Sequence, residues 1–158
     1  MKTSLSSIGL IAVFILLVSC TQNFVAAQND QKAEPTINGV WQTVVTPRIC
    51  ATGNPVGPTF PGILMFSQDG TMTGTSTAVT STYGNWKREP GRGEYSFASL
   101  SLKYDASGAF IGSRRISQNV TIDESGNSFT SSGTFQDYDA AGDPTTSGCS
   151  TSTGSRFH

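Results

Sequence analysis

The sequence predicts an all-β domain built as an eight-stranded antiparallel up-and-down barrel, with a β-sandwich as the alternative arrangement. From Asn38 onward, no window of about 11 residues shows the apolar stripe of an amphipathic helix. In addition, an Asp-x-x-Gly motif recurs in the second half of the chain, in YDASGAF, IDESGNSF and YDAAGD. The Asp side chain can accept a hydrogen bond from the backbone two residues on, and the Gly tolerates a positive φ. The motif is therefore typical of a type I hairpin turn.

The segments between these turns are the expected strands. SQDGT, at residues 67–71, adds a hairpin turn of the Asp-Gly type. Long consecutive antiparallel strands joined by short turns favour a closed barrel, because closure removes exposed strand edges. The expected strands span residues 38–48, 62–68, 71–79, 82–89, 93–104, 109–122, 127–138 and 146–157.

The N-terminus has the pattern of a bacterial export signal. Lys2 precedes an apolar stretch from Ile8 to Val18 that is too short to span a bilayer comfortably as a helix. The stretch ends in LVSC, which resembles the lipoprotein processing motif and would make Cys20 the lipidated first residue of the mature protein. Ordinary signal-peptidase cleavage after Ala27 is the alternative. Both cuts predict an exported protein, either anchored to the cell envelope by lipid or free in the periplasm or outside the cell.

The expected organisation is an export signal at residues 1–20, a linker at 21–37 and a β-barrel domain at 38–158. The linker shows no sustained period and would tether the domain to a membrane if Cys20 is acylated. Charged residues make up 13% of the chain, the net charge is −1, and no basic patch is visible. We therefore expect no nucleic-acid partner.

Cys50 and Cys149 remain after the export signal is removed, and they form an even pair in an oxidising compartment. We expect a disulfide between them, and two free buried thiols are the alternative. In an up-and-down barrel the end of the first strand lies beside the start of the last strand, which is where these cysteines lie. If they were directly opposite one another, Trp41 would lie opposite His158 and diagonal to Arg156.

The two ends of the domain carry a recognisable pattern. Gly39, Val40 and Trp41 form a G-x-W at the start of the first expected strand, and Arg156 lies at the end of the last one. This resembles the lipocalin, or calycin, family, in which the tryptophan packs beneath the arginine at the closed end of an eight-stranded barrel. The resemblance implies a calycin-like barrel with structural roles for Gly39, Trp41 and Arg156, although the family's C-terminal helix is missing. TPRIC and SGCSTSTGSRF also resemble segments of small exported bacterial proteins, a resemblance that implies no activity.

A long loop and several aromatic residues are the candidate ligand-binding elements. CATGNPVGPTFP, from Cys50 to Pro61, is too irregular for a strand. We interpret it as a lid over the barrel mouth, with a proline-stiffened connection as the alternative. Val56 and Phe60 would supply its apolar contacts. Four aromatic residues would line or floor the interior if their strand faces point inward: Tyr95, Phe97, Phe110 and Phe129.

Candidate catalytic groups are few. His158 is the single histidine and the last residue, which argues against a Ser-His-Asp triad, a Cys-His pair or a histidine-rich metal site. DYDAAGD lacks the later ligands of a calcium loop and is interpreted as a solvated turn. Arg114 and Arg115 point to opposite faces of one strand. One of them would face the interior and could pair with an anionic ligand, and an exposed arginine is the alternative. We expect no catalytic residues, no metal and no cofactor.

Three functions remain. The first is an exported barrel that binds a small apolar or amphipathic molecule without catalysis. The second is a structural or interaction protein of the bacterial cell envelope, and the third is a cofactor-free enzyme of the isomerase or cyclase type. A connected cavity of roughly a few hundred Å³ would favour the first function over the second.

Overall fold

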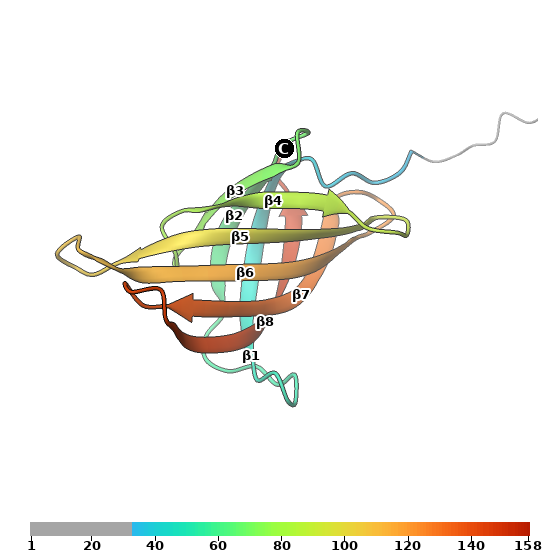
Figure 1. Cartoon of the computed structure of the whole chain (residues 1–158). Coiled ribbons are helices and arrows are strands. Elements are labelled where there is room, and N and C mark those ends of the chain that lie inside the picture. The colour runs from blue at the N-terminus through green and yellow to red at the C-terminus, as the bar shows by residue number, and fades with distance from the viewer. Residues whose placement is uncertain (1–32) are drawn as a thin grey trace, which may run out of the picture. The chain divides into compact units, whose positions relative to one another are not determined.

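The chain folds into eight antiparallel strands that follow one another around a closed barrel, with β8 returning to pair with β1 (Figure 1). The predicted fold class is therefore confirmed. The computed structural model describes residues 33–158, so the predicted export signal, both cleavage sites and Cys20 lie outside the described residues. The strands are β1 (Gly39–Arg48), β2 (Phe60–Phe66), β3 (Thr71–Ser76), β4 (Thr82–Arg88), β5 (Glu94–Tyr104), β6 (Phe110–Ile122), β7 (Ser128–Tyr138) and β8 (Pro144–Arg156).

The Asp-x-x-Gly motifs form hairpin turns, as predicted. At the β5–β6 turn, Asp105 Oδ1 accepts a hydrogen bond of 2.9 Å from the backbone N–H of Ser107. Gly108 closes this turn at a φ of 84°, a value that side chains disfavour. Asp139 Oδ1 likewise accepts a hydrogen bond from the backbone N–H of Ala141 in the β7–β8 turn, and Asp123 Oδ1 accepts one from the backbone N–H of Asn127 in the β6–β7 turn. Local turn chemistry thus explains the hairpins of the second half of the chain.

The third strand is shorter than expected. It ends at Ser76, and residues 77–81 form a loop before β4. Ser76 Oγ accepts hydrogen bonds of 3.1 Å from the backbone N–H groups of Ala78 and Val79. These local bonds compete with strand pairing and end the ladder at this point.

Alternate side chains point into the barrel, and the large apolar ones gather at the end where the domain begins and finishes. Ile37, at the end of the expected linker, is fully buried there, and the compact unit begins at Glu34. No helix in residues 33–158 is long and apolar enough to cross a membrane. The buried core at this closed end consists of Ile37, Trp41, Phe66, Met72, Tyr95, Phe97, Val120, Ile122 and Phe129.

Arg156 packs against Trp41 at the closed end. The guanidinium carbon lies 4.2 Å from the centroid of the Trp41 ring, within the range of a cation–π contact. The same guanidinium donates hydrogen bonds to the backbone carbonyl oxygens of Thr36 (2.7 Å), Asn38 (2.6 Å) and Gly126 (2.9 Å). One side chain therefore holds together the entry segment, β1, β8 and the β6–β7 turn.

The expected pairing of Trp41 with His158 is wrong, because the register of β1 on β8 differs by two residues. Trp41 lies directly opposite Arg156, and Cys149 lies opposite Arg48. The second cysteine, Cys50, lies in the turn after β1 and reaches back to its partner from there.

We predict that Arg156→Lys lowers the free energy of unfolding by about 2–4 kcal/mol. A lysine keeps the charge but loses the planar fork that serves three carbonyl groups and covers the Trp41 ring. Urea denaturation measures the difference. Arg115→Lys, at an exposed position, should change stability by less than about 0.5 kcal/mol. Equal effects of the two substitutions would contradict the assigned role of Arg156.

Cys50 and Cys149 lie at disulfide distance, with their Sγ atoms 2.11 Å apart and their Cα atoms 5.1 Å apart. They are separated by 99 positions in the sequence, so the bond would close a loop that takes in most of the barrel. It lies at the mouth end of the β1–β8 pairing, whereas Arg156 lies at the closed end.

We predict that the protein isolated from an oxidising compartment contains this disulfide and that reduction lowers the free energy of unfolding by about 4–5 kcal/mol. The loop-entropy relation gives this value for a loop of this length. Intact mass before and after reduction, followed by denaturation of both forms, provides the test. Two free thiols in the protein isolated from an oxidising compartment would disprove the prediction.

Candidate functional site

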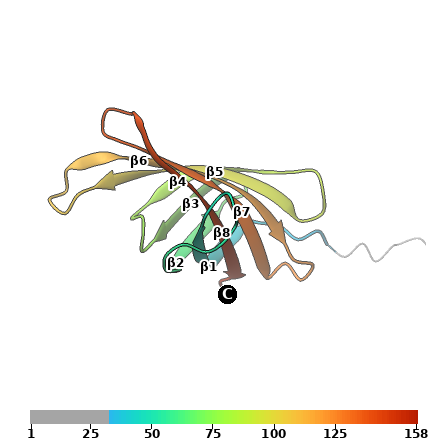
Figure 2. The same cartoon turned by 90° about the horizontal axis from the view of Figure 1, so that it is seen from below.

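A cavity of about 260 Å³ lies inside the barrel, between the buried core of the closed end and the mouth. The mouth is the end at which the β1–β2, β3–β4, β5–β6 and β7–β8 loops lie. Figure 2 shows that the β5–β6 and β7–β8 hairpins project beyond the ends of β3 and β4. The cavity is therefore a pocket with a floor and an entrance, as small-molecule sites are.

Apolar atoms make up most of the cavity wall. Val45 and Pro47 of β1, Phe60 and Leu64 of β2, and Val79 of the β3–β4 loop cover one side. The alternation of inward and outward positions along each strand places these side chains in the interior. Such a wall offers a ligand the burial of its apolar surface, worth about 25 cal/mol for each Å² removed from water.

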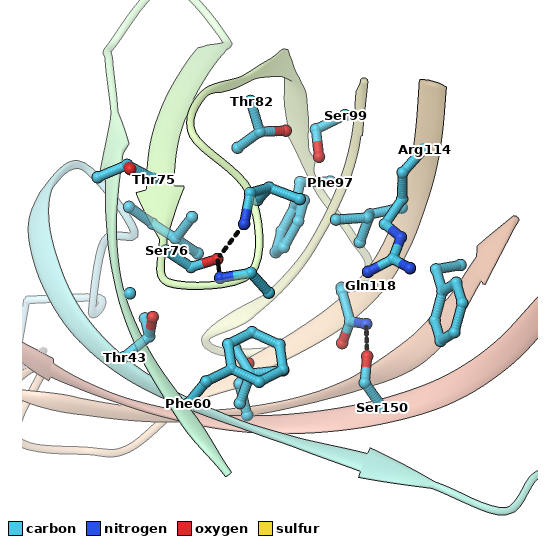
Figure 3. Close-up of a pocket in the computed structure, with 18 of the residues that line it drawn as sticks. Thr43, Phe60, Thr75, Ser76, Thr82, Phe97, Ser99, Arg114, Gln118 and Ser150 are labelled. Atoms are coloured by element: carbon cyan, nitrogen blue, oxygen red, sulfur yellow. Dashed lines mark hydrogen bonds between the residues drawn. The ribbon is translucent and has the colours of Figure 1, made fainter. Parts of the chain in front are cut away.

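Two polar atoms in this apolar surrounding have no hydrogen-bond partner. Ser99 Oγ and Gln118 Oε1 are buried and unpaired, and both residues line the cavity. The amide nitrogen of Gln118 donates a hydrogen bond of 2.9 Å to Ser150 Oγ, so its oxygen is left facing the other way (Figure 3). An unpaired buried polar atom costs about 1–3 kcal/mol, and a ligand that satisfied it would recover part of this cost.

Arg114 of β6 is the arginine that faces the interior, and it lines the cavity. It forms a bidentate ion pair with Asp137 of β7, with Nε 2.6 Å from Oδ1 and Nη2 2.9 Å from Oδ2. Lys103 Nζ lies 3.1 Å from the same carboxylate, whose side chain is only 6% exposed. The Arg114 guanidinium also lies 4.4 Å from the centroid of the Phe135 ring. Two cations and one anion therefore meet beside the cavity.

These contacts change the acidity of Asp137. The hydrogen bonds from Arg114, and then the hydrogen bond from Lys103, hold the pKa of the Asp137 carboxyl below its usual value of 3.8. When the pKa of a carboxyl group is lower in the folded state than in the unfolded state, its ionisation stabilises the fold. This stabilisation is fully present at pH values above the pKa of the unfolded state. This contribution is lost as the pH falls through the folded pKa.

We predict that the stability advantage of the wild-type protein over Asp137→Asn is constant near neutral pH and shrinks as the pH falls below about 4. Chemical denaturation at a series of pH values measures the difference. Asp143→Asn, on the exposed β7–β8 turn, controls for the loss of one negative charge. An advantage that stays unchanged down to about pH 2 would contradict the ion-pair account.

The six residues predicted to contact a ligand fall into three groups. Phe60 and Phe97 line the cavity. Tyr95 and Phe129 lie in the core of the closed end, beneath the cavity. Two others, Val56 and Phe110, are about half exposed and do not line it.

Phe110 has an inward position in the alternation of β6, yet it does not face the interior. The pairing of β6 with β5 shifts register between Lys103 and Tyr104, so that Gly112 lies opposite Lys103 but Phe110 lies opposite Tyr104. This irregularity interrupts the alternation and places Phe110 on the face of Tyr104. Its ring instead packs at 6.1 Å, centroid to centroid, against that of Tyr104 on the neighbouring strand. The expectation that Phe110 lines the barrel is corrected accordingly.

The β1–β2 loop, expected to be a lid, folds back on the end of β1. The backbone N–H of Val56 donates a hydrogen bond of 2.9 Å to the carbonyl oxygen of Pro47, and Pro55 forms a β-bridge with Arg48. Among the described residues, those between Pro47 and Phe60 contribute nothing to the cavity wall.

The loop that borders the cavity is instead the β3–β4 loop, through Ala78 and Val79. This border could not be predicted from the sequence, because residues 71–79 have the pattern of a single strand. The interior position of Arg114 could have been predicted from the sequence. Alternate residues of a strand share one face, so Arg114 lies on the same face of β6 as the buried residues Val120 and Ile122.

No protein-family model matches the chain, and neither the curated proteins nor the solved structures that were compared with it gave a match. Among residues 33–158, no three His, Cys, Asp or Glu side chains lie together as a metal site would require. The cavity itself is therefore the basis for assigning a function.

Proposed function

We propose that the barrel binds a small amphipathic molecule reversibly in its cavity, without turning it over. The observation that carries this proposal is a mouth-facing cavity of about 260 Å³ whose wall is mostly apolar but includes unpaired buried polar atoms. A wholly structural barrel of this size would gain stability by filling the space with larger side chains.

The lining supports binding rather than catalysis. Among residues 33–158, those in the cavity wall contribute hydroxyl groups, one amide and one guanidinium, but no histidine, cysteine or carboxylate. A nucleophilic hydroxyl needs a neighbouring base to be activated at neutral pH. Ser99 Oγ has none within hydrogen-bond distance, since it is unpartnered.

We further propose that the barrel is calycin-like and acts outside the cytoplasm. The packing of Arg156 on Trp41 at the closed end supports the first part. The disulfide distance between Cys50 and Cys149 supports the second, because such bonds persist in oxidising compartments. Lipidation at Cys20 would hold the barrel at a membrane, and mass spectrometry of the N-terminal peptide distinguishes this form from cleavage after Ala27.

We predict that the neutral fluorophore N-phenyl-1-naphthylamine binds the wild-type protein with a gain in fluorescence and that Ser99→Leu weakens this binding about tenfold or more. The leucine side chain would occupy the cavity and remove the unpaired hydroxyl. The melting temperature of Ser99→Leu should therefore be no lower than that of the wild type. Fluorescence titration and a thermal melt together separate lost binding from lost folding.

Leu100→Ser provides the matched control, because Leu100 is the next residue of β5 and is 41% exposed on the outer face. It should leave the affinity for the fluorophore unchanged. Failure of the wild-type protein to bind the fluorophore would rule out the proposed cavity function and favour a structural role in the cell envelope. Equal loss of binding in both variants would place the fluorophore on the outer surface.

A further inference from the structure

We propose that Lys103, Arg114 and Asp137 form an anion-recognition site at the side of the cavity, which selects ligands carrying one carboxylate-type group on an apolar body. This inference rests on the proposed function, because it names the chemical class of the ligand that the same cavity takes. The sequence left open whether either arginine of the pair at positions 114 and 115 faces inward.

The charge of the cluster is unbalanced. Lys103 and Arg114 both bind the one carboxylate of Asp137, which leaves a single excess positive charge. Asp137 is 6% exposed and Arg114 is 24% exposed at the side chain, so water screens this excess charge only partly. A monoanionic ligand group would neutralise the cluster, whereas a dianion would leave a net negative charge.

Arg114 has hydrogen-bond donors that its ion pair with Asp137 does not use. A guanidinium carries five N–H groups, and Asp137 accepts hydrogen bonds from only two of its nitrogens, Nε and Nη2. The third nitrogen, Nη1, takes no part in the pair with Asp137. Figure 3 shows the guanidinium pointing into the cavity on the side of Gln118. Asp137 thus orients Arg114 while leaving part of its fork available.

The surroundings strengthen the attraction for an anion. Phe135 lies under the guanidinium, and Ile116 and Phe97 line the cavity nearby. Because charge-assisted hydrogen bonds are stronger in such a low-dielectric setting than in water, few of them suffice for selection. The apolar wall across the cavity, with Val45 and Leu64, then holds the body of the ligand.

Unpaired hydroxyl groups lie on the strand next to Arg114. Ser101, which is 1% exposed, is its direct cross-strand partner on β5, and Ser101 Oγ has no hydrogen-bond partner. Ser99 Oγ, two residues earlier, is also buried and unpaired. Hydroxyl groups can donate to a ligand oxygen, so Ser99 would add a neutral donor beside the cationic one.

Arg115 shows that this arrangement is specific to one face of β6. It is the next residue, it is exposed, and its guanidinium lies 5.2 Å from the centroid of the Tyr138 ring, outside the barrel. The two arginines have the same charge and neighbouring positions, but only Arg114 borders the cavity. They therefore form a matched pair for a test.

The test compares two fluorophores that share one aromatic framework, the neutral N-phenyl-1-naphthylamine and the anionic 8-anilino-1-naphthalenesulfonate. We expect Arg114→Gln to weaken binding of the sulfonate at least about tenfold, as the loss of a charged hydrogen-bond donor does. Binding of the neutral probe should change less than about threefold. Arg115→Gln should leave the affinities for both probes unchanged.

A second variant tests the same site in case Arg114→Gln does not fold. Lys103 is 34% exposed at its side chain, and Lys103→Gln removes one positive charge without disturbing the Arg114–Asp137 pair. It should weaken binding of the sulfonate alone. Retained binding of the neutral probe in each variant shows that the cavity is intact.

Two results would overturn the inference, and they differ from each other. If the wild-type protein binds neither probe, the proposed function fails and the anion site fails with it. If the neutral probe binds but both Arg114→Gln and Lys103→Gln keep the wild-type affinity for the sulfonate, the cavity function stands and the anion site is refuted.

Discussion

The pairing of the first strand with the last strand is the constraint on which the rest of the structure depends. It closes the sheet, so that every strand has two neighbours and the barrel has an inside. Both ends of this pairing are fastened by side chains: Arg156 packs on Trp41 at the closed end, and Cys50 and Cys149 lie at disulfide distance near the mouth. Large apolar residues fill the closed end, whereas the interior toward the mouth contains a cavity whose wall combines apolar side chains with hydroxyl groups.

The inward face of β5 shows how this division arises. Tyr95 and Phe97 fill the closed end, and the inward positions that follow toward the mouth are Ser99 and Ser101, while Leu100 points outward and is exposed. A register slip of one residue would bury the leucine, yet the ladder with β6 holds the serines inside. The interior of the barrel thus holds unpaired serine hydroxyl groups, while an apolar leucine side chain stays exposed. This arrangement lowers the stability of the fold and is typical of a binding site.

Features that depend on residues close together in the sequence could be predicted, whereas features that depend on contacts between different strands could not. Turn chemistry at Asp105 and its counterparts is local, so strand number, order and class followed from it. The interior position of Arg114 was available from alternation alone. Phe110 was misplaced because a register shift between β5 and β6 interrupts the alternation just before it, and no local sequence pattern indicates this shift. In the same way, the ring of Phe135 packs over Gly148, where a Cβ would lie only 2.6 Å from it, a cross-strand fit that becomes visible only once the register is known.

The most direct test of the account is to locate a bound probe by NMR. Intermolecular NOEs from N-phenyl-1-naphthylamine to methyl groups distinguish the inside of the barrel from its outside. The account predicts NOEs to Val45, Leu64 and Ile116, whose side chains line the cavity. NOEs confined to the exposed methyl groups of Ile63 and Leu100 would contradict it, because they would place the ligand on the outer face of a barrel whose interior admits none.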